Sequence, residues 1–263
     1  LISQKGFENV IPIDVTLGKA FDSLIITGSN TGGKTVTLKT LGISALMVKA
    51  GMYLPSGIDS EMTFFEKVLA DIGDEQSLEQ NLSTFSAHLV NINKIIENAD
   101  KNSLILIDEI GTGTDPTEGS AIAQAIIEKL REKEAKIVVT THYGELKTLA
   151  YKYTGISNAS VEFNIETLSP TYRLLLGIPG KSNAVHIAQR LGFEPEVITR
   201  AKELLSSEHG DISDSVEKLE KEYKKIVDER TKLEKINLSL KDKEDTYNKQ
   251  LQELEIKKKK LKE

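Results

Sequence analysis

The sequence contains no cysteine and no apolar run long enough to cross a membrane. Without cysteine, the chain forms neither a disulfide framework nor a thiolate metal site. The first residues lack the layout of a signal peptide, so we expect a cytoplasmic protein with no membrane partner. The absence of an initiating methionine predicts that the chain is a fragment of a longer protein.

An excess of basic residues is also lacking. The 263 residues include 34 Lys and Arg against 40 Asp and Glu, which gives a formal net charge of −6. Nucleic-acid-binding domains usually have the opposite balance, so we do not expect tight DNA binding by this piece. The length and the 39% of hydrophobic residues suffice for one large domain or two small ones with a core.

The clearest motif begins at Gly28, directly after the apolar residues 24–26. It fits the pattern G-x-x-x-x-G-K-[ST] between an expected strand and an expected helix. In this motif backbone N–H groups and the helix N-terminus bind phosphate oxygens. We predict that Lys34 contacts the β- and γ-phosphates and that the Thr35 hydroxyl ligates Mg²⁺. The alternative is a glycine-rich turn that binds nothing. The predicted nucleotide-binding residues are Gly28, Ser29, Asn30, Thr31, Gly32, Gly33, Lys34 and Thr35.

A second motif supplies the acidic residues that a phosphate loop needs. Residues 104–107 are an apolar run that predicts a buried strand, and Asp108 and Glu109 follow it directly. Such a strand would bring Asp108 to the Mg²⁺ and Glu109 to the attacking water. The alternative is a strand that ends in solvated acids. His142 follows another apolar run, residues 137–139, where a polar residue can act at the carboxyl end of a strand.

Periodicity and turn residues predict the elements around these motifs. A helix begins near Ser83 or Thr84, either of which could be its N-cap. The other predicted elements are a half-buried strand at 9–18, a helix from the phosphate loop to about Ala50, strands within 64–72 and 156–176, a loop at 111–119, a helix at 121–131, a turn at 170–173, and short helices at 184–191 and 195–205.

The pattern changes from Val216 onward. Residues 216–261 repeat core positions in steps of three and four without any Gly or Pro, which predicts a coiled-coil helix. The core positions fall into two alternating sets. One set contains polar residues such as Arg230, Asn237 and Glu244, so we expect weak pairing of the isolated segment. The other set is entirely apolar: Leu219, Ile226, Leu233, Leu240, Tyr247, Leu254 and Leu261.

Several segments between and after the nucleotide motifs resemble the MutS family of mismatch-repair ATPases, which are of the ABC type. The family resemblance is carried by Asn81-Leu-Ser-Thr-Phe85, residues 108–119 and Thr141-His142. Finer matches are similar to the second bacterial MutS paralogue, the branch of MutS-type endonucleases. These matches are residues 72–77, 141–147, 158–162 and 170–174.

The resemblance implies an α/β fold of the P-loop NTPase, ABC-ATPase type, with a mixed or parallel sheet flanked by helices. This domain would cover residues 1–207, including a helical pair at about 178–205, and a coiled-coil segment would follow at 208–263. ATP and Mg²⁺ would be the cofactors, with Thr35 and Asp108 at the metal. Lys34, Glu109 and His142 would be catalytic, Glu109 as the base for water and His142 as the γ-phosphate sensor.

The resemblance also implies a homodimer with composite ATP sites, in which Ser83 contacts the γ-phosphate of the partner subunit. The branch is associated with branched DNA and suppression of recombination, and with collided ribosomes. Its nuclease domain is not in this chain, so we expect no nuclease activity here. The remaining implied roles are Thr84 beside Ser83, Gly113, Thr114 and Asp115 in an interface loop, Gln76 in a coupling loop, and Val10 and Ile11 at the adenine.

Other protein classes fit the sequence less well or differ in activity. A chromosome-maintenance ATPase would place its coil between the two nucleotide motifs, whereas here the coil follows both. A GTPase would need an Asn-Lys-x-Asp guanine reader, which the sequence lacks. A nucleotide-gated dimerisation module with negligible turnover stays open as an alternative to a working ATPase.

Overall fold

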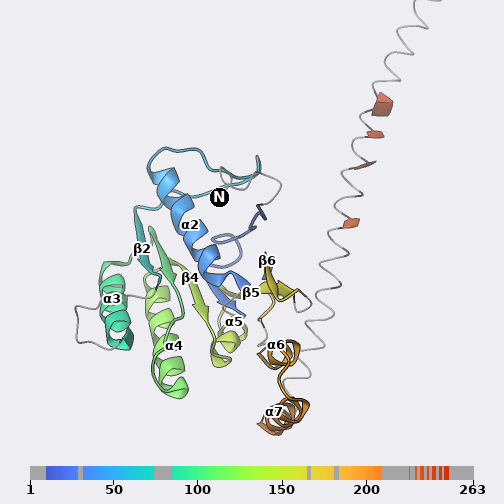
Figure 1. The fold of residues 1–263 in the computed structure, drawn as a ribbon. Helices are drawn as coiled ribbons and strands as arrows, with labels where there is room; N and C mark the ends of the chain where they lie inside the picture. Colours follow the sequence, from blue (N-terminus) through green and yellow to red (C-terminus); the bar gives the residue numbers. More distant parts are fainter. Residues whose placement is uncertain are drawn as a thin grey trace, which may run out of the picture. The chain divides into compact units, whose positions relative to one another are not determined.

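A computed structural model describes residues 10–28, 32–73, 84–164, 167–180 and 184–208, and scattered positions between 225 and 248 (Figure 1). The chain divides into two compact units, Leu1–Ile198 and Thr199–Glu263. The first unit contains the sheet and all the described residues of the predicted nucleotide site, so it is the unit that bears on function.

A six-stranded sheet forms the centre of the first unit, with the strand order β2-β3-β4-β1-β5-β6. The strands β2, β3, β4, β1 and β5 are parallel to one another, and β6 is antiparallel to β5. All residues of β1 and of β3 are buried, as expected for central strands covered on both faces. The strands are β1 (Ser23–Thr27), β2 (Lys67–Asp71), β3 (Ser103–Ile107), β4 (Lys136–Thr141), β5 (Ile156–Asn164) and β6 (Ser169–Leu176).

Helices cover both faces of the sheet, which confirms the predicted mixed sheet flanked by helices (Figure 1). Leu24 and Ile26 of β1 share a buried cluster with Leu38 of helix α2, whereas Ile25 lies in the cluster that contains residues of α3 and α4. Side chains alternate between the faces of a strand, so β1 supplies both clusters. The helical segments are α2 (Lys34–Lys49), α3 (Thr84–Asn98), α4 (Pro116–Glu132), η3 (Glu145–Thr148), α5 (Leu149–Lys152), α6 (Ala184–Arg190) and α7 (Pro195–Glu208).

The strand predicted at 9–18 is wrong over its described part, because residues 10–22 are irregular. The two neighbours of β1 are β4 and β5, so no strand position beside it is left for this segment. Its apolar side chains Val15, Leu17 and Phe21 instead pack singly against the cluster on the α2 face. The alternation of apolar residues in this segment therefore reflects packing against the core and not pairing as a strand.

The predicted turn at 170–173 is also wrong, since these residues lie inside β6. Proline lacks an N–H group, which excludes it from the middle of a sheet, but β6 is an edge strand. Pro170 pairs opposite Phe163, and the register shifts between Val161 and Phe163. The edge position and this bulge together accommodate a residue that usually ends a strand.

The loop predicted at 111–119 ends earlier, because α4 begins at Pro116. The carboxylate of Asp115 accepts hydrogen bonds from the backbone N–H groups of Thr117 at 2.9 Å and Glu118 at 3.2 Å. An aspartate N-cap followed by proline is a strong helix start. The glycine at position 119 lies within the helix.

The described positions between 225 and 248 are all helical. They include Leu233, Leu240 and Tyr247 of the predicted apolar series, whose side chains are more than half exposed. The rest of that series lies outside the described residues, and the pairing of this helix stays a prediction. In the described part of the chain no helix has the length and apolar character of a membrane span.

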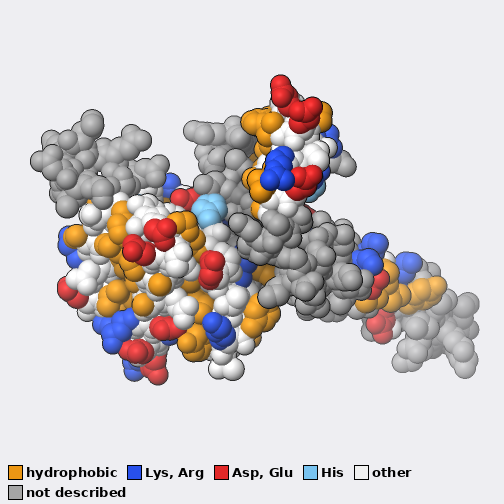
Figure 2. All heavy atoms as spheres, turned by 90° about the horizontal axis from the view of Figure 1, so that it is seen from below, with side chains coloured by type: hydrophobic (Ala, Val, Ile, Leu, Met, Phe, Trp, Pro, Cys, Tyr) orange, Lys and Arg blue, Asp and Glu red, His pale blue; other side chains and the backbone are white. Residues whose placement is uncertain are grey.

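Charges of both signs are mixed among the described side chains on the face drawn in Figure 2. Figure 2 shows one face, on which lysines and arginines alternate with aspartates and glutamates among apolar side chains. No single basic area dominates the described side chains of this face, in keeping with the net charge of −6.

Candidate nucleotide site

Three segments that carry predicted site residues leave the same edge of the sheet. Gly28, His142 and Asp108 each follow the last residue of a strand, β1, β4 and β3 respectively. These strands are adjacent and parallel, so their carboxyl ends meet at one edge. Ligand sites of open α/β sheets lie at this edge.

Lys34 is the most deeply placed charged residue of the site, with a residue exposure of only 2%. Its Nζ donates to the carbonyl oxygen of Gly28 at 2.6 Å and lies 3.2 Å from His142 Nε2. Burial lowers the pKa of Lys34 to about 8, although the carboxylates of Glu109 and Asp108 act in the opposite direction. A buried ammonium group gains when an anion reaches it, so this position suits a phosphate.

Asp108 is held between two threonine hydroxyl groups. Thr35 Oγ1 donates to one carboxylate oxygen at 2.6 Å, and Thr140 Oγ1 donates to the other at 2.5 Å. The Thr35 hydroxyl and the Asp108 carboxylate are the hard oxygen ligands that Mg²⁺ prefers, and their contact shows that one ion could reach both. Within the described ranges no group of three or more His, Asp or Glu residues could form a cage for a metal. The Thr35 hydroxyl and the Asp108 carboxylate fit Mg²⁺, an ion that usually binds through one or two carboxylates together with waters and substrate phosphates.

Glu109 lies beside His142, with 3.2 Å between Glu109 Oε1 and His142 Nε2. Both side chains are more than one-third exposed, which leaves them accessible to a water molecule and a ligand. The backbone of Glu109 has a φ of 50°, in the left-handed region that non-glycine residues rarely adopt. Its N–H group donates to Thr140 Oγ1 at 2.7 Å. Strained backbone of this kind persists where surrounding contacts hold it, often at functional sites.

The geometry at Gly33 requires glycine. Its φ is 101°, and a Cβ atom built there would lie 2.9 Å from the ring of Tyr172 in β6. Glycine therefore lets the chain enter α2 directly beneath β6 and keeps Lys34 at the first helical position.

The family comparison adds an independent observation to this geometry. The family model described as MutS domain V matches residues 24–208. This chain belongs to the MutS family. Since MutS domain V is a P-loop ATPase domain, the phosphate loop, Asp108 and Glu109 belong to a MutS ATPase domain.

Individual MutS relatives indicate the branch. The chain is similar to proteins named Endonuclease MutS2, which supports a MutS paralogue of the MutS2 type. It is 57% identical over 211 residues to the protein of Clostridium tetani (80% of this chain and 27% of the relative), and 53% identical over 208 residues to that of Symbiobacterium thermophilum (79% and 26%). The chain thus spans about a quarter of the length of the curated relatives it matches.

Several predicted residues of the MutS site stay predictions. Gly32 is buried at the start of the described part of the loop, and α3 begins at Thr84. Val10 and Ile11 lie in the irregular segment before β1, and Ile11 is 50% exposed. The predicted residues Ser29, Asn30, Thr31, Gln76 and Ser83 lie outside the described residues.

The predicted interface loop has structural contacts within its own subunit. A Cβ atom at Gly113, whose φ is 98°, would lie 3.1 Å from Phe85 Cβ at the start of α3. Thr114 directly precedes Asp115, the N-cap of α4. Tyr143 Oη donates to the Gly111 carbonyl at 2.8 Å, so the loop is also fixed to the segment after β4. These contacts position the loop, and its role between MutS subunits stays a prediction.

Two contributors to the MutS site were missed in the sequence. Thr140 holds both the Asp108 carboxylate and the Glu109 backbone, as described above. Gly180 donates its N–H to Thr27 Oγ1 at 2.6 Å, and a Cβ atom there would lie 2.7 Å from the Thr27 carbonyl. The threonine at the end of an apolar strand run was a usable signal for Thr140, whereas Gly180 is 153 residues from Thr27 and carried none.

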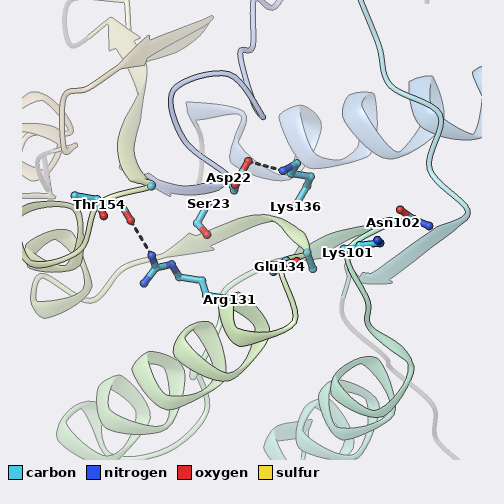
Figure 3. A pocket seen from close by; sticks show the side chains of 10 residues that line it. Asp22, Ser23, Lys101, Asn102, Arg131, Glu134, Lys136 and Thr154 are labelled. Atoms are coloured by element: carbon cyan, nitrogen blue, oxygen red, sulfur yellow. Dashed lines mark hydrogen bonds and ion pairs between the residues drawn. The ribbon is translucent and has the colours of Figure 1, made fainter.

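The opposite, amino edge of the same sheet carries a separate pocket of about 440 Å³. Figure 3 shows two internally paired groups in it. Lys136 binds Asp22 at 2.5 Å, and Arg131 donates to the Thr154 carbonyl at 2.7 Å. None of the predicted nucleotide ligands of the MutS domain lines this pocket.

Proposed function

We propose that this MutS domain binds ATP with Mg²⁺ and hydrolyses it. The observation that carries the proposal is the convergence of Lys34, Asp108 and Glu109 at the carboxyl edge of the sheet. Family membership supports the nucleotide, because MutS domain V is an ATPase domain.

Each residue would have a distinct part in the reaction. Lys34 would exchange its hydrogen bond to Gly28 for phosphate oxygens, which compensates its burial. Thr35 and Asp108 would hold Mg²⁺, which supplies charge neutralisation at the phosphates when bound. Glu109 would accept a proton from the attacking water and orient it in line with the γ-phosphate. His142, within hydrogen-bond distance of both Lys34 and Glu109, would report the state of the γ-phosphate to this pair.

The decisive test of hydrolysis is Glu109→Gln. The substitution keeps the shape of the side chain and removes the base, so ATP affinity should be retained while turnover falls by about 10²–10⁴-fold. Calorimetry and steady-state phosphate release measure the two quantities. Wild-type turnover that is negligible under the same conditions would instead favour a nucleotide-gated dimerisation module. Equal turnover in wild type and variant would contradict the assignment of Glu109.

We also propose that ATP binding drives homodimerisation through composite sites, with Ser83 completing the site of the partner subunit. The resemblance of residues 81–85 to the MutS signature supports this role, and a ligand that binds only the dimer stabilises it by mass action. Mixing Ser83→Ala with Lys34→Ala chains provides the test. In a mixed dimer with shared sites, one site has both lesions and the other has none. Some turnover should therefore return, and a verified mixed dimer without any recovery would contradict shared sites.

For the whole protein we propose a cytoplasmic enzyme that couples this ATPase to branched DNA, to collided ribosomes, or to both. The proposal rests on the MutS2-type similarity, and the relatives that carry the similarity are named endonucleases. The ATPase of the full-length protein should be stimulated by its physiological target. Measuring turnover with branched DNA, linear duplex and stalled ribosomes separates the two targets, and no change with any of them would contradict the proposal.

A further inference from the structure

A buried polar cluster lies beside the nucleotide site at the end of β2. Its centre is Asp71, which is 6% exposed. One carboxylate oxygen lies 2.8 Å from His88 Nδ1, and the other accepts a hydrogen bond from Asn91 Nδ2 at 2.7 Å. His88 and Asn91 both belong to α3, so these two bonds fasten the helix to the end of the strand.

The same aspartate is bonded to the metal-binding segment through its backbone. The carbonyl oxygen of Asp71 accepts the N–H of Asp108 at 2.8 Å. β2 and β3 are neighbours with Asp71 opposite Ile107, so this bond extends their ladder by one residue. Asp71 thus joins α3 on its side-chain side to Asp108 on its backbone side.

A buried carboxylate carries a desolvation penalty that an apolar contact lacks, and from this we infer a role beyond packing for the cluster. Burial of a carboxylate is unfavourable unless hydrogen bonds compensate it, and an apolar replacement is often at least as stabilising. α3 already has apolar anchors in Ile92 and Ile95, both buried in the core. Asp71, His88 and Asp108 line a hollow of only about 10 Å³, room for about one water.

We propose that Asp71, His88 and Asn91 form a positioning contact that couples α3 to the Mg²⁺ ligand Asp108. α3 begins at Thr84, one residue after Ser83, the residue proposed to contact the partner's phosphate. When Ser83 contacts the partner's phosphate, a shift of α3 would reach Asp108 through Asp71. The coupling rests on the proposed function, and it makes metal binding at one site sensitive to phosphate at the other.

Two substitutions of His88 separate hydrogen bonding from packing. An ionised carboxylate only accepts hydrogen bonds, so His88 donates from Nδ1. His88→Leu removes this donor, whereas His88→Asn retains a donor near the Nδ1 position. Asn93→Leu is the matched control on the exposed part of the same helix, where Asn93 bonds only Glu97 among the described side chains. Asn91→Leu removes the second bond to Asp71 and serves if His88→Leu fails to fold.

The measurement is Mn²⁺ affinity by electron paramagnetic resonance, with the 263-residue chain saturated by a non-hydrolysable ATP analogue. Loss of a contact behind a metal ligand typically weakens metal binding by about tenfold or more, so His88→Leu and Asn91→Leu should each weaken Mn²⁺ by about tenfold. His88→Asn and Asn93→Leu should stay within about twofold of wild type. Affinity for the analogue without metal should not change in any variant, since none of these side chains lies in the phosphate loop.

Unchanged Mn²⁺ affinity in both leucine variants of the cluster would overturn the coupling, as would failure of His88→Asn to restore it. Phosphate release measured alongside distinguishes the two proposals. If the wild-type chain shows no turnover but the leucine variants still bind Mn²⁺ more weakly, hydrolysis is contradicted and the coupling is supported. Normal turnover with no Mn²⁺ effect contradicts only the coupling.

Discussion

The two edges of one sheet use similar charged side chains for different purposes. At the carboxyl edge Lys34 and Asp108 are buried: Lys34 donates to the Gly28 carbonyl at 2.6 Å, and Asp108 accepts from the Thr35 hydroxyl at 2.6 Å. At the amino edge the side chains of Lys136 and Asp22 form an ion pair at 2.5 Å while 28% and 54% exposed. The two edges therefore differ in burial more than in charge: the groups of the first edge have lost water and would gain from the phosphate and metal ion proposed above.

Replacing one lysine at each edge of the sheet should give the largest difference in ATP affinity between the two edges. Lys34→Ala should weaken ATP binding by orders of magnitude, because it deletes the cation that faces the phosphates. Lys136→Ala, the matched control at the amino edge, should leave ATP affinity unchanged. Calorimetric titration with ATP measures both, and circular dichroism verifies the folds. Equal affinities in the two variants would remove the distinction between the edges.

Adding one methyl group at each of two glycines tests how tightly the carboxyl edge is packed. Gly180→Ala would place Cβ 2.7 Å from the Thr27 carbonyl, which forces the start of the phosphate loop to move. We expect the free energy of unfolding to fall by about 1–3 kcal/mol. Gly144→Ala is the control, since its φ is −64° and no atom lies within 4 Å. Thermal melts compare them, and a smaller loss for Gly180→Ala than for Gly144→Ala would contradict the close packing.

The lowered pKa of Lys34, about 8, predicts that ATP binding takes up a proton in mildly alkaline solution. Phosphate charge raises the pKa of a neighbouring ammonium, so about three quarters of a proton should enter at pH 8.5 and about one tenth at pH 7. Calorimetry in buffers of different ionisation enthalpy gives the number directly. No uptake at pH 8.5 would show that Lys34 is already charged there.

The same pKa fixes the sign of a stability effect. Between pH of about 8 and 10.5 the unfolded chain binds more protons at Lys34 than the folded one. Without nucleotide, the contribution of this residue to the free energy of unfolding therefore rises with pH across that window. Below a pH of about 8 both states are protonated, and the cost of burying the charge is fully present.

The smallest effect is expected at the amino edge. Asp22→Asn should lower the free energy of unfolding by at most about 1 kcal/mol, because the Asp22 side chain is more than half exposed and water screens its pair with Lys136. Added salt should reduce the difference further. Urea unfolding at low and high ionic strength measures it, and a loss several times larger would mean that this edge also depends on desolvated charge.

The sequence predicted the parts of the site that are local in the chain. Lys34 and Thr35 follow from the spacing of one motif, and Asp108 and Glu109 from one apolar run. The structure brings Thr35 to Asp108 and Glu109 to His142 as the predicted strand ends require. The local pattern sufficed here, because the residues that directly follow buried parallel strands lie at a common edge of the sheet.

The sequence did not predict contacts that only the sheet order creates. Asp71 belongs to a strand that could neighbour several others, and its bond to Asp108 depends on β2 lying beside β3. His88 carried no local signal of a partner. Pro170 was misassigned for the same reason, because proline in a strand is excluded or allowed according to whether that strand lies at an edge.

The edge strand β6 has a consequence for solubility. An unpaired strand edge is a template on which another chain can add a strand, the first step of aggregation. β6 interrupts that template with Pro170, which offers no N–H group, and with Tyr172, whose φ of 56° breaks the extended ladder. The ring of the same tyrosine packs on Gly33 at the phosphate loop. Tyr172 thus both interrupts this edge strand and packs over the entrance to α2.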